Sequence, residues 1–151
     1  MSREEKAIFT NMCMIYDESE NILVQNRLDP NWPGITFPGG HVEARESFVE
    51  SVIREVKEET GLLIEKPILC GTKQFMTENN ARYVVLFYKT KQFSGNLRSS
   101  KEGEVFWINR KELSDYVLAN DMEEMVKVFE RDEWSEFYYY QENGKWKSKL
   151  L

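Results

Sequence analysis

The sequence predicts an α/β domain, in which strands on both sides of an amphipathic helix form a sheet. Three observations lead to this prediction. Apolar, strand-like segments occur before and after one well-capped helix, an order that is typical of the α/β class. The chain of 151 residues is 41% hydrophobic and 13% aromatic, which suffices for one buried core. It contains no repeat and no Pro/Gly/Ser linker, so we expect a single domain over residues 1–151.

The N-terminal segments predict two strands followed by a loop. Residues 7–16 and 21–26 are rich in apolar residues, and the polar stretch Asp17 to Glu20 separates them, which indicates a β-hairpin. Residues 31–40 carry two prolines and three glycines around a short apolar piece. Such a segment is typical of a loop with unusual backbone conformations.

A helix over residues 48–60 is the most clearly bounded element. Ser47 is suited to be its N-cap, and Glu50 follows three residues later, as in a capping box. Gly61 is suited to end the helix in a left-handed conformation. The sequence therefore predicts both ends of this helix as well as its interior.

The C-terminal half predicts more strands, two further helices and a final hairpin. Asn109 with Glu112, and Asn120 with Glu123, have the spacing of capping boxes at the two helix starts. Asn143-Gly144 favours a type I′ turn. The predicted strands are residues 68–77, 82–88 and 104–108, and the arms of the hairpin are residues 136–141 and 145–148.

Charge and composition exclude several classes of protein. A formal net charge of -6 argues against a protein that binds long nucleic acid through its phosphates. Cys13 and Cys70 have no Cys or His at ligand spacing, so neither a disulfide framework nor a zinc site is indicated. The charged N-terminus and the absence of a long apolar run predict neither secretion nor a membrane span, so we expect a cytoplasmic protein.

The helix over residues 48–60 carries two distinct sets of side chains. Glu55, Glu58 and Glu59 have helical spacing and are expected on one face near the solvent side. Arg54 can reach Glu50 or Glu58 and hold a carboxylate in orientation. An apolar stripe that must face a core is formed by Val49, Val52, Ile53 and Val56.

The three carboxylates admit two interpretations. An arbitrary Glu-rich helix is usually a solvated acidic face. Here, however, Glu55 and Glu59 repel each other at i,i+4, and all three carboxylates lie near the negative end of the helix dipole, where anions are disfavoured. A divalent cation such as Mg²⁺, also held by substrate phosphates, would relieve this repulsion.

The segment GHVEARESFVESVIREVKEETGL, residues 40–62, resembles the Nudix box at every defined position. These positions are Gly40, Glu46, Arg54-Glu55, Val56, Glu58-Glu59, Gly61 and Leu62. The resemblance implies an α/β/α sandwich, the Nudix fold, in which a mixed β-sheet lies between helices. It also implies a metal-dependent hydrolase that cleaves a phosphoanhydride bond in a nucleoside diphosphate derivative.

The resemblance also implies roles for individual residues. Glu58 and Glu59 are similar to the family's metal ligands, and Gly39 or Gly40 would add a backbone carbonyl. Glu55 matches a position that binds metal or acts as general base. Arg54 would orient these groups, and Glu46 is similar to a structural glutamate. The cofactor would be Mg²⁺, with Mn²⁺ possible, as one to three ions.

Many family members use a further glutamate before a strand that carries a tryptophan. In Lys101 to Trp107, Glu104 is the first candidate and Glu102 the second. Both could equally be exposed turn residues. The sequence leaves this choice open.

The substrate is expected to be a small nucleotide. Residues 37–40, FPGG, resemble the segment before the box in MutT-like nucleoside triphosphate pyrophosphatases, which act on nucleotides such as 8-oxo-dGTP. Asn120, in LAND, is similar to an asparagine that reads the purine edge, although it also suits an N-cap. Phe37 or Trp32 could stack on a base or belong to the core.

Alternatives to a triphosphate substrate remain. The chain could hydrolyse a nucleotide sugar or a dinucleotide, although signatures of those branches are missing. It could also be a noncatalytic nucleotide sensor, which the complete set of box glutamates disfavours. The protein could be a monomer or a homodimer, because the aromatic residues 137–140 could pack internally or form a dimer strand.

Overall fold

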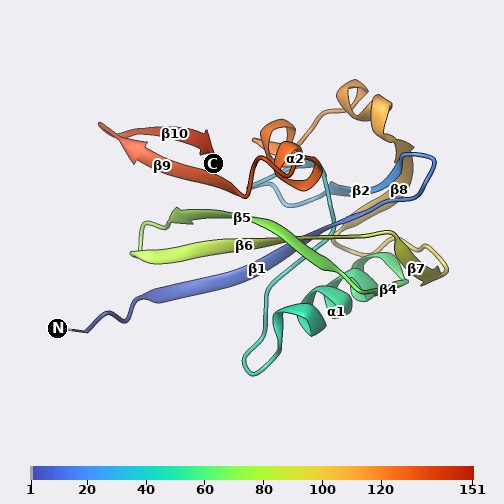
Figure 1. The fold of residues 1–151 in the computed structure, drawn as a ribbon, viewed down its shortest axis with the longest axis horizontal. Coiled ribbons are helices and arrows are strands. Elements are labelled where there is room, and N and C mark those ends of the chain that lie inside the picture. Colours follow the sequence, from blue (N-terminus) through green and yellow to red (C-terminus); the bar gives the residue numbers. More distant parts are fainter. Residues whose placement is uncertain (1) are drawn as a thin grey trace.

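The computed structural model describes residues 2–151 and contains ten strands, two α-helices and one 3-10 helix (Figure 1). In chain order the elements are β1 (Lys6–Ile15), β2 (Asn21–Arg27), β3 (Gly34–Thr36), α1 (Phe48–Thr60), β4 (Leu62–Glu65), β5 (Ile68–Met76), β6 (Ala81–Thr90), β7 (Gln92–Gly95), β8 (Gly103–Asn109), η1 (Arg110–Asp115), α2 (Met122–Glu130), β9 (Glu136–Glu142) and β10 (Lys145–Leu150). Neither described α-helix is long and apolar enough to cross a membrane.

The predicted sandwich is confirmed. A five-stranded sheet has the order β1-β6-β5-β9-β10, and it is mixed, because β1 and β6 are parallel while β5 and β6 are antiparallel. A second sheet has the order β3-β2-β8, and β4 pairs with β7. Helices α1 and α2 lie on opposite sides of the larger sheet (Figure 1).

Strand β1 shows why both sides of the sheet are covered. Its last six residues are all buried, and the four apolar ones at its end alternate between two clusters. Met12 and Met14 belong to the cluster that includes α2, whereas Cys13 and Ile15 belong to the cluster that includes α1. A strand that buries both faces cannot have a polar face, because successive side chains point to opposite sides.

The predicted hairpin between the first two strands is wrong. Both strands exist, but β1 and β2 lie in different sheets and share only a bridge between Tyr16 and Ile22. One edge of β1 pairs with β6, and the other receives the loop after β3. There the amides of Asn11 and Cys13 donate to the carbonyls of Gly40 and Pro38, so no edge remains for β2.

The predicted caps at Ser47, Gly61 and Asn109 are confirmed, and the one at Asn120 is wrong. Ser47 and Gly61 end α1 as predicted, since Ser47 Oγ accepts from the amide of Glu50 and Gly61 has a φ of 80°. Asn109 forms its capping box, but the element that follows is a 3-10 helix. Asn120 does not cap α2, because Asp121 occupies the N-cap position, with a φ of 68° and no side-chain cap bond.

The remaining strand predictions agree with the structure. Strands β5, β6 and β8 occupy the predicted segments, and β9 and β10 form the final antiparallel hairpin. Asn143 and Gly144 both have positive φ, as the type I′ prediction requires. The short strands β4 and β7 are not anticipated by the sequence pattern. They follow α1 and β6 and pair only with each other.

Two glycines with similar backbone conformations provide a matched test of how α1 ends. Gly61 and Gly144 have φ values of 80° and 78°, but only at Gly61 would a Cβ clash, 2.5 Å from the carbonyl oxygen of Asn96. We expect Gly144→Ala to lower the free energy of unfolding by about 1–2 kcal/mol, the cost of a left-handed conformation. Gly61→Ala should cost clearly more in urea denaturation, and equal losses would contradict this account.

Candidate functional site

A cavity of about 800 Å³ lies where the two larger sheets, α1 and α2 meet. One group of lining residues is acidic and includes Glu55, Glu59 and Glu102. A second group is aromatic and includes Trp32, Phe75, Tyr83 and Tyr139. The rest of the lining comprises Thr10, Asn11, Met12, Arg27, Asp29, Asn31, Phe37, Gly39, Gly40, His41, Lys73, Val85, Asn120, Asp121 and Met125.

Glu59 is the most buried carboxylate of the site, with 6% of its surface exposed. The sequence places it near the solvent side, and this prediction is wrong. Glu59 follows Val52 by about two helical turns, so it shares the face that packs against the sheet. Its Oε2 accepts hydrogen bonds from the amide of Gly39 at 3.0 Å and from Gln25 Nε2 at 3.4 Å.

The apolar stripe of α1 is correspondingly shorter than predicted. Val52 and Val56 are fully buried and Ile53 packs against the same cluster, but Val49 is 43% exposed. Ser51, Glu59 and Thr60 are buried in its place. Ser51 and Glu59 have hydrogen-bond partners distant in sequence, whereas Thr60 bonds locally to the carbonyl of Val56. Ser51 Oγ, for example, accepts from Asn11 Nδ2 on β1.

Burial controls the pKa values of the cavity carboxyls. The pKa of Glu59 is raised to about 7, chiefly by desolvation; the charges of Glu55 and Glu102 act in the same direction, and the hydrogen bond from the amide of Gly39 opposes them. Burial also raises the pKa of Glu55, although Arg54 opposes the shift. Both groups therefore lie in an environment that disfavours their charged forms in the absence of a cation.

Arg54 connects the acidic residues around the cavity. Its Nε donates to Glu46 at 2.6 Å, and its Nη1 donates to Glu55 at 3.0 Å and to Glu58 at 3.2 Å. The contact with Glu58 is one of the two that the sequence predicts, whereas Glu50 instead bonds to Ser47. Arg54 therefore offsets part of the negative charge of Glu55 and Glu58. The hydrogen bond from Arg54 also holds the pKa of Glu46 at about 2.

The carboxylate oxygens of the cavity suit a hard cation, although they are not arranged as a complete coordination shell. Among residues 2–151, no group of three or more Asp, Glu, His or Cys side chains is arranged to hold a metal ion. Glu58 is 58% exposed, bonded to Arg54 and outside the cavity lining. The oxygens of Glu55, Glu59 and Glu102 nevertheless share one cavity, and carboxylate oxygens are what Mg²⁺ prefers.

Two features near Glu59 support this fit. Gln25 is fully buried, and its Oε1 has no hydrogen-bond partner among the described residues, which leaves an acceptor beside the carboxylate. Gly40 lies so close to Glu55 that a Cβ would come 2.3 Å from the carboxyl carbon. A side chain at residue 40 would therefore displace Glu55 from its present position.

The candidates for the distal glutamate are separated by their positions. Glu104 lies on β8, is exposed and does not line the cavity. Glu102 precedes β8, lines the cavity and is close enough to influence the pKa of Glu59. Glu104 faces the solvent because side chains alternate along β8, where Gly103 and Val105 are buried, whereas Glu102 lies in the turn before β8 and does not follow that alternation.

Phe37 and Trp32, the two residues that could stack on a base, both line the cavity but differ in burial. Phe37 is 2% exposed and packs edge-on against Phe129 with ring centroids 5.1 Å apart, so it is mainly a core residue. Trp32 is half-buried, and its Nε1 donates to the carbonyl of Asn120 at 3.0 Å. The Asn120 side chain bonds to Asp121 at 3.4 Å, and both residues line the cavity.

The sequence does not single out Lys73, Tyr83 or Tyr139, although all three line the cavity. A signal for Lys73 does exist. Residues two apart on a strand share a face, so Lys73 and Phe75 on β5 point the same way, towards the side where Phe75 is packed. A lysine on the inward face of a strand is unusual, because lysine side chains are rarely buried without a partner.

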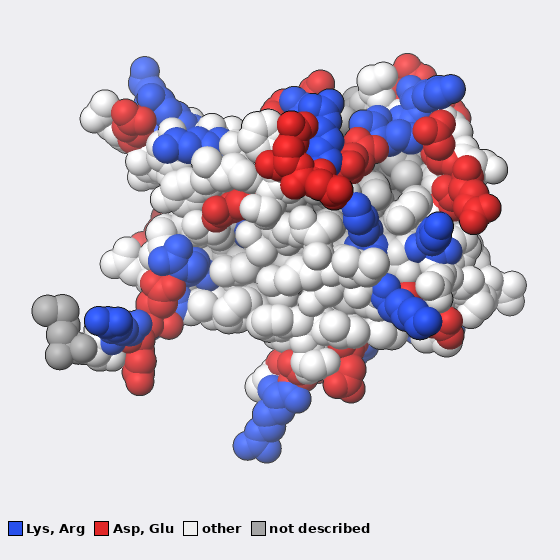
Figure 2. All heavy atoms as spheres, in the orientation of Figure 1, with Lys and Arg blue, Asp and Glu red and all other residues white. Residues whose placement is uncertain are grey.

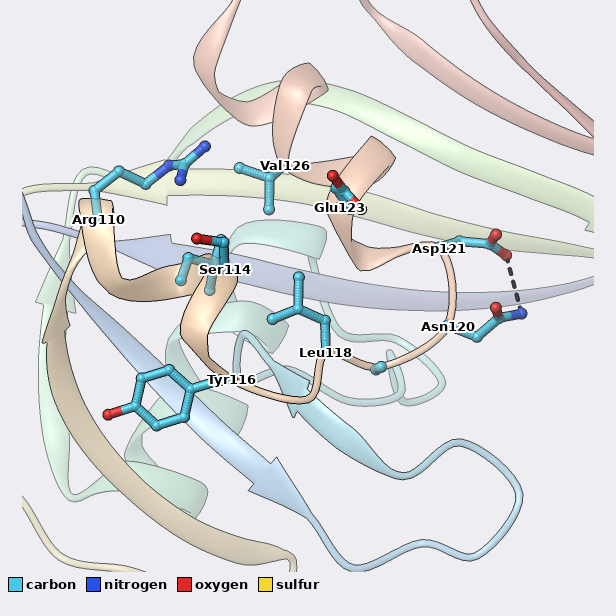
Figure 3. A pocket seen from close by; sticks show the side chains of 10 residues that line it. Arg110, Ser114, Tyr116, Leu118, Asn120, Asp121, Glu123 and Val126 are labelled. Carbon is cyan, nitrogen blue, oxygen red and sulfur yellow. Dashed lines mark hydrogen bonds between the residues drawn. The ribbon is translucent and has the colours of Figure 1, made fainter.

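A second cavity, of about 550 Å³, adjoins the first (Figure 3). It lies between η1, the loop that follows it and α2, and it shares Asn120 and Asp121 with the larger cavity. Its lining has no carboxylate cluster, because Asp121 and Glu123 are its only acidic residues among those described. The shared Asn120–Asp121 pair therefore forms part of the wall between two hollows.

The charged residues are distributed without a large basic area on the face shown in Figure 2. Lys and Arg alternate with Asp and Glu around the rim, and a band of uncharged residues crosses the middle. This view agrees with the net charge of -6, which does not favour long nucleic acid.

The chain resembles several known proteins. It is 29% identical over 122 residues to the ADP-ribose pyrophosphatase of Methanocaldococcus jannaschii, covering 78% of this chain and 70% of the relative. It is 26% identical over 123 residues to the 8-oxo-dGDP phosphatase NUDT18 of Mus musculus, covering 78% of this chain but 37% of that protein. The fold matches a MutT protein from Bacillus halodurans with a TM-score of 0.76 and 23% identity, over 95% of this chain and 97% of the other.

The family model that matches this chain describes the NUDIX domain and covers residues 9–131. The match contains the complete box and the strands and helices that surround it, so most of the described structure lies within it. Only the final hairpin of β9 and β10, and a few N-terminal residues, lie outside. The chain therefore belongs to the Nudix family of hydrolases.

Proposed function

We propose that this chain hydrolyses a phosphoanhydride bond in a (deoxy)nucleoside triphosphate such as 8-oxo-dGTP, releasing a monophosphate and pyrophosphate. The observation that carries the proposal is the composition of one cavity. The box carboxylates Glu55 and Glu59 line it together with several aromatic side chains, including Trp32. The first group suits a metal-bound diphosphate, and the second suits a nucleobase.

The reaction needs a divalent cation, which we propose to be Mg²⁺, with Mn²⁺ as a substitute. Glu55, Glu58 and Glu59 would hold it, together with the carbonyl of Gly39. When bound, the ion supplies charge neutralisation for the phosphate oxygens and a more acidic water. For Glu58 to contribute, its carboxylate must leave Arg54, to which it is bonded at 3.2 Å.

The protein groups then have distinct roles. Glu55, half-buried beside Gly40, is placed to accept a proton from the attacking water. Arg54 fixes the orientation of Glu55 through a hydrogen bond of 3.0 Å and is itself held by Glu46. We assign the distal glutamate to Glu102 in place of Glu104, because only Glu102 lines the cavity.

The base would be held by residues away from the carboxylates. Trp32 offers a half-buried ring, whereas Phe37 supports the wall from within the core. Asn120 would pair with a base edge, because its amide offers both a donor and an acceptor. Within the described part of the chain, its exposed side chain bonds to Asp121 alone, at the long distance of 3.4 Å, so it can turn towards a ligand.

ADP-ribose is the second candidate substrate, because a relative with 29% identity is an ADP-ribose pyrophosphatase. Both substrates contain a nucleoside diphosphate, so the carboxylate group serves either one. They differ in the group beyond the diphosphate and in the base. A comparison of products from both substrates therefore separates the two functions.

A panel of substrates tests the proposed reaction. Purified protein with Mg²⁺ should release pyrophosphate from at least one nucleoside triphosphate, with 8-oxo-dGTP compared directly against dGTP, ATP and ADP-ribose. Turnover should stop when the metal is removed with a chelator and return when Mg²⁺ is added. Release of AMP and ribose phosphate from ADP-ribose, with no triphosphate hydrolysed, would replace this proposal with the second candidate.

The pair Glu102 and Glu104 provides a matched test of the site assignment. We expect Glu102→Gln to lower kcat by roughly 10²-fold or more, the scale of a lost acid–base or ligand group, and Glu104→Gln to leave kcat near that of the unsubstituted protein. Steady-state kinetics with the best substrate of the panel measures both. The reverse order of effects would show that the distal glutamate is Glu104.

Glu59 predicts a dependence of stability on pH in the absence of metal. Its pKa of about 7 in the folded protein exceeds the unfolded value of 4.5, so the folded protein loses stability as the pH rises through this interval. Glu59→Gln removes the buried charge. The variant should be more stable than the unsubstituted protein at pH 8, by on the order of 3 kcal/mol, and equally stable near pH 4.5.

Thermal unfolding in a chelator, followed by circular dichroism at both pH values, measures this difference. Mg²⁺ at pH 8 should then raise the melting temperature of the unsubstituted protein and have little effect on Glu59→Gln, because a ligand that binds only the folded state stabilises it. A variant that is less stable at pH 8 would show that the charged carboxylate is not destabilising in this environment.

A further inference from the structure

Lys73 is a cation in an unusual environment. It lies on β5, lines the cavity and is surrounded by aromatic rings from three parts of the chain. Its Nζ is 5.5 Å from the ring centroid of Trp32, 5.7 Å from Phe75 and 5.8 Å from Tyr139. Phe137 is at 5.6 Å. Such distances allow cation–π attraction, which offsets part of the cost of burying the charge.

The ammonium group lacks a strong hydrogen-bond partner in the protein. Among residues 2–151, no carboxylate lies within 4.0 Å of Lys73 Nζ, and its only polar contact is with the sulfur of Met125 at 3.9 Å. Burial lowers the pKa of Lys73, and the charge of Asp121 opposes that shift. Up to three N–H donors are therefore available to a molecule in the cavity.

Arg27 adds a second cation with an unused donor on the same wall. Its guanidinium carbon is 5.4 Å from the ring centroid of Trp32, and its Nε is buried without a partner among the described residues. Arg27 and Lys73 therefore place two cations beside Trp32, the ring that is best placed to stack on a base. Unsatisfied buried donors are costly, and a ligand acceptor would remove that cost.

We propose that Lys73 is a specificity-determining residue that binds a keto oxygen of the substrate's base and so selects guanine-type nucleotides over adenine-type ones. The proposal rests on the proposed function, because it assigns the base to this cavity. Guanine and 8-oxoguanine carry a keto acceptor, O6, at the position where adenine carries an amino donor. A group that only donates can bond to O6 but not to that amino group.

A phosphate is a poorer occupant of the same position. Asp121 lies close enough to influence Lys73, and its negative charge would repel an anion. The surroundings of the ammonium group are aromatic faces, which suit a planar ring more than a tetrahedral group. An uncharged keto oxygen avoids the repulsion by Asp121 and still accepts from Lys73.

The four rings around Lys73, those of Trp32, Phe75, Phe137 and Tyr139, form a cage. This cage depends on the final hairpin, which lies outside the residues that the family model matches. Strand β9 pairs with β5 in a parallel register that sets Lys73 opposite Phe137, and Tyr139 follows two residues later. Tyr139 is in turn stacked on Trp146 of β10, with ring centroids 4.5 Å apart. The final hairpin therefore provides two of the four rings around Lys73, and it lies outside residues 9–131, which the family model matches.

Equilibrium binding of GMP and AMP to the protein in a chelator tests the proposal without requiring hydrolysis. The unsubstituted protein should bind GMP at least tenfold more tightly than AMP, and Lys73→Met, which keeps a side chain of similar length, should bring the ratio close to one. Lys73→Arg should retain a preference for GMP. Lys89→Met is the matched control, because it removes another half-buried ammonium that lies outside the cavity.

Unchanged selectivity in Lys73→Met, tighter binding of AMP, or no GMP binding would overturn the proposal. Loss of inorganic phosphate binding in Lys73→Met with an unchanged GMP:AMP ratio would show that Lys73 binds an anion. Circular dichroism and the melting temperature confirm that each variant folds. A protein that prefers GMP but hydrolyses no triphosphate would refute the proposed function and leave the role of Lys73 intact.

Discussion

The hydrogen bond from the amide of Gly39 to the buried carboxylate of Glu59 is the contact on which the site depends. It joins the loop after β3 to the last turn of α1, and Gln25 on β2 approaches the same oxygen. A carboxylate at this depth is unfavourable unless it is neutralised or paired. Its burial in the last turn of α1 is the reason why we propose that it binds a cation.

The loop that carries Gly39 is held as firmly as a strand. It lies along β1 through backbone hydrogen bonds from Asn11 and Cys13, and a Cβ on Gly39 would collide with the carbonyl of Asn11. This close approach requires glycine and occupies the edge of β1 that a hairpin partner would need. The separation of β1 and β2 into two sheets, and the cavity between those sheets, follow from the same contact.

The cavity combines two environments with opposite electrostatic character. Its acidic residues favour a cation and, through it, phosphate groups, whereas Lys73 and Arg27 present donors among aromatic rings. Arg27 is close enough to both regions to lower the pKa of Glu59 and to contact Trp32. A nucleotide has the same division, with an anionic chain at one end and a planar, hydrogen-bonding base at the other. The arrangement therefore fits both the proposed hydrolysis and the proposed selection of the base within one cavity.

The sequence by itself determined the box, the caps of α1, most strands and the family, because these depend on local spacing and on backbone preferences at Ser47 and Gly61. It misplaced Glu59, it did not show that Glu102 lines the cavity while Glu104 does not, and it did not find the cage around Lys73. Those features depend on contacts between α1, β2, β8 and the final hairpin, which are far apart in the chain. Only the tertiary structure decides them, since burial and charge environment are properties of packed neighbours and not of a residue's own segment.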